Sequence, residues 1–165
     1  VTTGFDGVFL KQLKTFGAVE RVPYCRVLTV VYYALINPDY HDLKSSPLAK
    51  SVKWFDVDNL PEVGFDIREI ILDAIQKLRE DVRHYPLGFH LLPEKFTLTQ
   101  LQTLYEIILG KSLDTRNFRK KILKMRFLSD TGKKQANVAH RAAKLYTFHH
   151  KRYNNLVKEG LNFRI

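Results

Sequence analysis

A strongly basic segment without a single acidic residue lies between residues 115 and 126. Lysine and arginine neutralise phosphates or hydrogen bond guanine edges, and asparagine pairs with adenine through two hydrogen bonds. A surface that is merely solvated usually mixes charges of both signs. The segment therefore favours double-stranded DNA as a partner, although binding to RNA or to another protein stays open. The candidate DNA-binding residues here are Arg116, Asn117, Arg119, Lys120, Lys121 and Lys124.

The apolar residues of this segment have the spacing of a helix. Asp114 is a suitable N-cap, and at 100° per residue Phe118 and Ile122 share one face. The polar side chains lie roughly on the opposite face. Arg116 and Asn117 stand near the predicted N-terminus, where recognition helices usually contact bases. The lysines that follow are expected to lie along phosphates.

The neighbouring segments predict a winged helix around this element. Thr97 and Gln100 form a capping-box pattern in front of a predicted helix over 98–109. A polar turn is expected at 129–134, and residues 143–148 alternate with the period of a strand. A helix, a basic helix and then a hairpin is the order of a winged helix. Further candidate DNA contacts are Thr99 and Gln100, through the N–H groups of the helix start, and Lys133, Lys134, Arg141 and Lys144 on the wing.

The charge of the chain is concentrated in its second half. Of the formal net charge of +10, residues 1–82 contribute −2, from 10 basic and 12 acidic residues. Residues 83–165 contribute +12, from 17 basic and 5 acidic residues. Such asymmetry indicates two modules, of which the second faces a polyanion. The change in composition places the boundary between about residues 84 and 93.

Signs of catalysis or of a cofactor are scarce. The sequence has none of the common hydrolase, nucleotide-binding or zinc-protease motifs, and its histidines are scattered. We therefore expect no catalytic residue, no metal site and no cofactor. The single cysteine, Cys25, excludes a disulfide scaffold and is expected to be a buried structural thiol. No apolar run is long enough for a membrane span, so a soluble, cytoplasmic protein is expected.

The first half combines predicted strands with one long helix. Residues 26–36 are so apolar that they predict a buried central strand, and residues 8–16 predict another strand with its connection. Asp66 is a suitable N-cap for a helix over 67–83, in which apolar residues recur every three or four positions. The whole chain is thus expected to have an α+β fold.

Several segments resemble one family of regulators. LKQLKTFG at 10–17 and RVPYCRVLTVVYYALI at 21–36 resemble the second half of a Nudix domain, and GFDIREIILDAIQKLRED at 64–81 resembles its last helix. Residues 96–123 and the AAKLYTF segment at 142–148 closely resemble the C-terminal winged helix of Nudix-related, NrtR-like transcriptional regulators. TLTQLQTLYE and LDTRNFRKKI occur together at the spacing of that family.

The resemblance implies a partial Nudix-like α/β/α sandwich in residues 1–84, followed by a winged helix-turn-helix domain in residues 85–165. It implies a repressor or activator that binds operator DNA as a homodimer and a sugar or ADP-ribose-type effector, such as arabinose or ADP-ribose, in the Nudix-like domain. The candidate effector-binding residues are Arg21, Arg26 and Tyr32, on or beside the predicted central strand. Core packing is an alternative role for Tyr32, and a structural ion pair for Arg26.

The resemblance also bears on hydrolase activity. Thr3, Gly4 and Phe5 fit the tail of a Nudix box, and the rest of that box would precede Val1. Its paired glutamate positions then fall on Val1 and Thr2, which cannot ligate a metal as carboxylates do. The alignment implies a catalytically degenerate domain. The alternative is a Nudix hydrolase of the ADP-ribose pyrophosphatase type with a basic C-terminal extension.

Overall fold

The computed structural model of the chain describes residues 10–38, 43, 50–136, 139, 141–161 and 163–165. The chain divides into two compact units, 1–77 and 78–165. The boundary falls inside the long helix α1, Ile67–His84. No helix in the described part is both long enough and apolar enough to cross a membrane. Val1 to Phe5, on which the Nudix-box alignment depends, lie outside the described residues.

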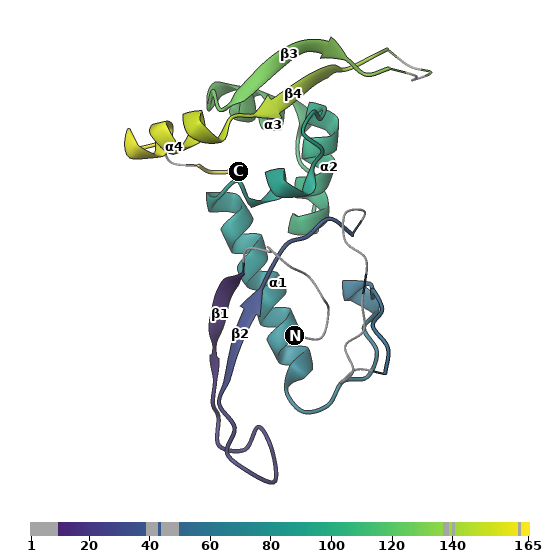
Figure 1. Cartoon of the computed structure of the whole chain (residues 1–165), viewed down its shortest axis with the longest axis vertical. Helices are drawn as coiled ribbons and strands as arrows, with labels where there is room; N and C mark the ends of the chain where they lie inside the picture. Colours follow the sequence, from purple (N-terminus) through teal and green to yellow (C-terminus); the bar gives the residue numbers. More distant parts are fainter. Residues whose placement is uncertain (1–9, 39–42, 44–49, 137–138, 140, 162) are drawn as a thin grey trace. The chain divides into compact units, whose positions relative to one another are not determined.

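The first unit contains a two-stranded sheet and the first part of α1 (Figure 1). β1 (Lys11–Phe16) pairs antiparallel with β2 (Thr29–Tyr33). A short 3-10 helix, η2 (Val57–Asn59), precedes α1. Lys14 of β1 forms an ion pair of 2.5 Å with Asp73 of α1, so α1 and the sheet are joined by a charged contact at this point.

The prediction of a buried central strand at 26–36 is wrong. β2 is only five residues long, and its side chains alternate between half-buried and exposed. Val30 and Tyr32 remain 50% and 51% exposed. The described sheet has two strands, so β2 pairs along one edge only, and apolar composition does not by itself bury a strand face. Cys25, expected to be buried, is exposed in the loop between the strands.

The second unit has the element order of a winged helix (Figure 1). After α1 and the 3-10 helix η3 (Leu87–Leu91) come α2 (Leu98–Leu109) and α3 (Thr115–Lys124). An antiparallel hairpin of β3 (Leu128–Lys134) and β4 (Lys144–Phe148) follows, and then α4 (His150–Lys158). Its core consists of Val82, Phe89, Phe96, Leu98, Leu101, Tyr105, Leu109, Phe118, Ile122, Phe127 and Phe163.

The helix ends in this unit follow local signals. The Thr97–Gln100 capping box forms as predicted, and the Asp114 side chain caps α3 by accepting a hydrogen bond from the Asn117 N–H. α3 ends at Lys124, two residues earlier than predicted. The reason is the backbone of Arg126, whose φ of 61° is left-handed and cannot continue a right-handed helix.

The polar turn expected at 129–134 is instead part of strand β3. Gly132 has a φ of 69°, and its N–H donates to Asp130 Oδ1 at 2.9 Å. The pairing of β3 with β4 is irregular between Asp130 and Lys134. The glycine therefore makes a bulge within the strand, and the tip of the hairpin lies further along, between Lys134 and Lys144.

Gly110 is the position where a glycine matters most for the second unit. It ends α2 in the left-handed conformation, with a φ of 65°. A Cβ at this position would stand 3.0 Å from the Arg79 guanidinium, which can shift, whereas the left-handed backbone cannot relax. We expect Gly110→Ala to lower the free energy of unfolding by about 1–2 kcal/mol. Chemical denaturation checks this value, and an unchanged free energy would contradict it.

Candidate nucleic-acid interface

α3 presents the residues that sequence analysis singled out for DNA binding. Its buried side consists of Phe118, which is 5% exposed, and Ile122, which is fully buried. Because these two side chains pack into the core, the other side of the helix faces solvent. The exposed polar residues on it are Arg116, Asn117, Lys120, Lys121 and Lys124. No acidic side chain occurs on α3, so every charged side chain on its exposed surface is cationic.

Arg119 differs from the other basic residues of α3. It is only half exposed, and its Nη2 donates to Thr99 Oγ1 of α2 at 3.0 Å. Its Nε is buried without a hydrogen-bond partner. The guanidinium thus leans toward the start of α2 and does not extend from the exposed face of α3.

The start of α2 is occupied largely by its own cap. Gln100 N–H, expected to face a phosphate, donates to Thr97 Oγ1 at 3.1 Å instead. The Gln100 side chain accepts a hydrogen bond from Thr97 N–H at 2.8 Å. Thr99 is exposed, and its hydroxyl oxygen accepts from Arg119. Of the two N–H groups expected to face a phosphate, that of Gln100 is therefore already bonded within the cap.

The hairpin carries the predicted basic wing. Lys133, Lys134 and Arg141 are exposed. Lys144 Nζ lies 2.8 Å from Asp130 Oδ2, so its charge is partly neutralised within the hairpin. The pKa of the Asp130 carboxyl lies below its usual value, mainly because this carboxyl accepts a hydrogen bond from Lys144. The same contact raises the pKa of Lys144, which keeps this ammonium group protonated.

The three predicted effector-binding residues do not converge. Arg21 donates from Nε and Nη2 to the two carboxylate oxygens of Asp66, at 2.7 and 2.9 Å. Its Nη1 donates to Thr29 Oγ1 at 2.5 Å, and its side chain is only 7% exposed. Arg21 therefore has the structural ion-pair role that sequence analysis considered for Arg26. Arg26 is exposed, and the half-exposed Tyr32 donates from its hydroxyl to Gln12 Oε1 at 3.4 Å.

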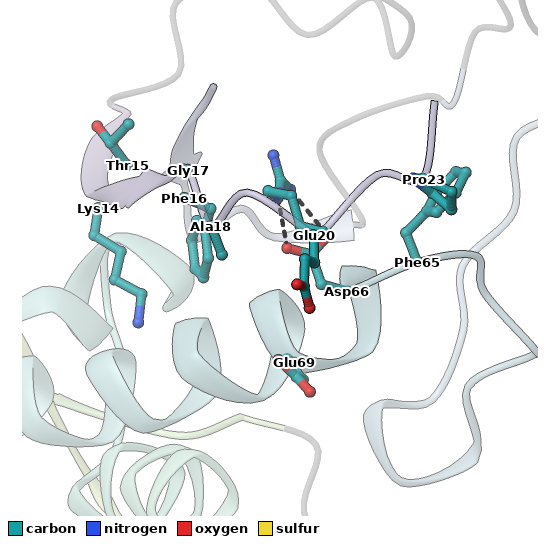
Figure 2. Close-up of a pocket in the computed structure, with 11 residues that line it drawn as sticks. Lys14, Thr15, Phe16, Gly17, Ala18, Glu20, Pro23, Phe65, Asp66 and Glu69 are labelled. Atoms are coloured by element: carbon teal, nitrogen blue, oxygen red, sulfur yellow. Dashed lines mark hydrogen bonds and ion pairs between the residues drawn. The ribbon is translucent and has the colours of Figure 1, made fainter. Parts of the chain in front are cut away.

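A hollow of about 730 Å³ lies in the first unit beside this ion pair (Figure 2). Its lining comes from the end of β1, the loop after it and the start of α1, and includes Lys14, Phe16, Glu20 and Glu69 besides Arg21. Arg26 and Tyr32 are not among its lining residues. Sequence analysis missed the other lining residues because they belong to segments far apart in the chain and share no motif.

The Arg21–Asp66 pair makes the first unit sensitive to acid. The hydrogen bond from Arg21 is the main cause that lowers the pKa of the Asp66 carboxyl. A lowered folded-state pKa stabilises the fold above the unfolded pKa of about 4, and this contribution is lost as the pH falls through the folded value. We expect Asp66→Asn to unfold more readily than wild type at neutral pH, with the difference vanishing in acid. Fluorescence of Trp54, the only tryptophan, measures this, and a pH-independent difference would contradict it.

No cluster of three or more histidine, cysteine or carboxylate side chains capable of holding a metal ion occurs among the described residues. The geometry of the first unit thus offers a hollow and an internal ion pair, whereas the second unit offers an exposed cationic helix beside a basic hairpin.

Comparison with known proteins shows what these features are similar to. Residues 88–148 match the NrtR DNA-binding winged helix domain. Over 149 residues the chain is 32% identical to a protein of Acinetobacter baylyi named ADPR responsive transcriptional repressor NtrR, and the matched region covers 88% of this chain. The chain is similar to NrtR-like, Nudix-related regulators, and residues 88–148 match their DNA-binding winged helix. It spans 58% of the length of that relative, which is less than two thirds.

Solved structures agree with this NrtR-like assignment. NrtR of Shewanella oneidensis, complexed with a 27mer DNA, is 29% identical with a TM-score of 0.71, over 88% of this chain and 67% of that one. A second crystal structure of Shewanella oneidensis NrtR is 27% identical with a TM-score of 0.73, and the match covers 92% of this chain and 69% of that one. A MutT/nudix family protein of Enterococcus faecalis shares the fold, with 23% identity and a TM-score of 0.61. The match covers 84% of this chain and 60% of that one. The α+β expectation of a Nudix-like part and a winged helix is confirmed.

Proposed function

We propose that the chain is part of an ADP-ribose-responsive transcriptional repressor that binds double-stranded operator DNA. The proposal assigns effector binding to residues 1–84 and DNA binding to residues 85–165. Its main support is the exposed, basic face of α3, which has no acidic side chain, within a winged helix of the NrtR type. A homodimer in the cytoplasm is the form in which we expect it to act.

The DNA interface is proposed to comprise the exposed face of α3, the start of α2 and the hairpin. Arg116 and Asn117 at the N-terminus of α3 would contact bases, and the remaining residues would contact phosphates. These remaining residues are Thr99, Gln100, Arg119, Lys120, Lys121, Lys124, Lys133, Lys134, Arg141 and Lys144. The structure of NrtR complexed with a 27mer DNA, similar over 88% of this chain, supports DNA as the partner.

The effector is proposed to be ADP-ribose, because the Acinetobacter relative is named an ADPR-responsive repressor. A pentose such as arabinose is the second candidate effector from sequence analysis. We place the effector in the first unit, where the hollow beside Arg21 provides cationic, acidic and aromatic side chains within one cavity. The hydrolase alternative is not favoured, because the relative that matches 88% of this chain is named a transcriptional repressor, whereas the MutT/nudix protein, at 23% identity, shares the fold alone.

Selection of DNA sequences tests the DNA-binding half of this proposal. The chain is incubated with random duplexes of about 30 base pairs, roughly three helical turns, and bound duplexes are amplified and sequenced. We expect one motif to be enriched. Absence of any enriched motif would overturn the proposal, and cleavage of ADP-ribose with Mg²⁺ in parallel would favour the hydrolase.

Lys120 gives a prediction for the phosphate contacts. Lys120→Gln removes one cation from the exposed face of α3, so fewer counterions are released on binding. We expect the slope of log K against log salt to become shallower by about 0.9. Lys53→Gln, which removes the same charge from the first unit, serves as the control and keeps the wild-type slope. Equal salt-dependence slopes for the two variants would show that Lys120 does not contact a phosphate.

A further inference from the structure

A cluster of polar contacts holds the turn between α2 and α3. Gln102 of α2 is 8% exposed, and three acceptors lie within hydrogen-bond distance of its Nε2 and share its two N–H groups. The acceptors are Glu106 Oε1 at 3.0 Å, the Leu113 carbonyl oxygen at 3.1 Å and Thr115 Oγ1 at 3.0 Å. Since Thr115 is the first residue of α3, one side-chain amide joins the middle of α2 to the turn and to the start of the next helix.

Glu106 completes the cluster from the following turn of α2. Its Oε1 also accepts the Leu113 N–H at 2.8 Å. The hydrogen bond from Gln102, followed by that from Leu113, lowers the pKa of this carboxyl, which therefore stays ionised and a strong acceptor at neutral pH. Both backbone polar groups of Leu113 are thus bonded to side chains of α2, which fixes the chain just before Asp114 and α3.

Apolar packing alone does not fix α3 in this way. Phe118 lies against Tyr105 of α2 with the ring centroids 5.7 Å apart, and such ring pairs tolerate centroid separations from about 4.5 to 7 Å. Hydrogen bonds to bases instead require donors and acceptors to be placed within a few tenths of an ångström. The side chains that would contact bases, Arg116 and Asn117, follow Thr115 directly, so the cluster acts at the end of α3 where such precision matters.

We infer that Gln102 and Glu106 are positioning residues for sequence-specific DNA recognition. They act through Thr115 and Leu113 on the placement of Arg116 and Asn117, and they do not contact DNA. This inference rests on the proposed DNA-binding function. Discrimination between DNA sequences then depends partly on two residues of α2. Sequence analysis did not select them, because neither residue is basic and Gln102 is buried.

The test compares two variants of Glu106 that lose the same charge. Glu106→Gln keeps an acceptor oxygen for Gln102 and Leu113, whereas Glu106→Ala keeps none. Binding of the full chain is measured to the duplex enriched in the selection and to a scrambled duplex of equal composition. We expect Glu106→Ala to reduce the affinity ratio of the two duplexes about five- to tenfold, as loss of a bonded partner does, and Glu106→Gln to keep most of it. Thermal unfolding of each variant is followed in parallel.

Gln102→Met is the second variant, because it keeps the side-chain volume but removes the donor. We expect it to reduce the affinity ratio while binding to the scrambled duplex stays near wild type. Equal affinity ratios for wild type, Glu106→Ala and Gln102→Met would overturn the inference, as would equal losses for Glu106→Ala and Glu106→Gln. If wild type itself does not distinguish the two duplexes, the proposed function fails instead.

Discussion

Replacing Arg116 and Asn117 together with alanine is expected to abolish most of the preference for the selected DNA sequence. Both side chains are exposed at the N-terminus of α3. Each specific base contact contributes about 1–3 kcal/mol. Two such losses lower specific affinity roughly thirtyfold or more, since about 1.4 kcal/mol corresponds to a factor of ten. Binding isotherms on the selected and scrambled duplexes measure this effect.

The control for this double variant removes cations elsewhere on the same unit. Lys151→Ala with Arg152→Ala changes two exposed residues of α4. It is expected to weaken binding to both duplexes to the same small extent. If the Arg116 and Asn117 variant lost affinity equally on the selected and scrambled duplexes, α3 would bind phosphates only, and the assignment of base contacts would be wrong.

Truncation of Phe127 is expected to have the largest effect on stability. Its ring is fully buried and lies within 6.0 Å of the rings of Phe89, Phe148, Tyr153 and Phe163, measured between centroids. These partners come from η3, β4, α4 and the C-terminal segment. Phe127→Ala therefore leaves a cavity where four segments meet, and we expect a loss of about 3–5 kcal/mol. Denaturant titration of the chain gives this value.

Phe127→Leu is the control variant, because it removes the aromatic ring but leaves only a small cavity. It keeps most of the apolar volume, so we expect a cost of less than about 1.5 kcal/mol. DNA binding by this variant should remain close to wild type. A cost for Phe127→Ala below about 1 kcal/mol would show that the aromatic cluster does not carry the stability of the second unit.

The winged helix could be predicted almost completely from the sequence, because its signals are local. The Thr97–Gln100 capping box and the Asp114 cap each join residues three positions apart, and apolar periodicity marked the buried side of α3. The position of the hairpin tip was missed. A glycine after polar residues is typical of a turn, yet at Gly132 the same backbone conformation makes a bulge inside β3.

The first unit was predicted less well, because burial and ion pairing depend on distant parts of the chain. Apolar composition alone predicted that residues 26–36 are buried, but Val30 and Tyr32 are half exposed. The partner of Arg21 is Asp66, which is 45 residues away, and no local pattern could distinguish Arg21 from Arg26. The candidate DNA interface shows the same limit, since only the structure shows that Arg119 leans toward Thr99.

The most direct test of the proposed function is a titration of ADP-ribose into the complex of the protein with its selected duplex. Fluorescence anisotropy of the labelled duplex reports how much remains bound, and arabinose, xylose and AMP are titrated separately. We predict that ADP-ribose changes DNA binding in a saturable manner, while AMP at equal concentration does not. If the anisotropy stayed unchanged with ADP-ribose but responded in a saturable manner to a pentose, the effector would be that pentose and not ADP-ribose. No response to any of these compounds would contradict an effector-responsive repressor.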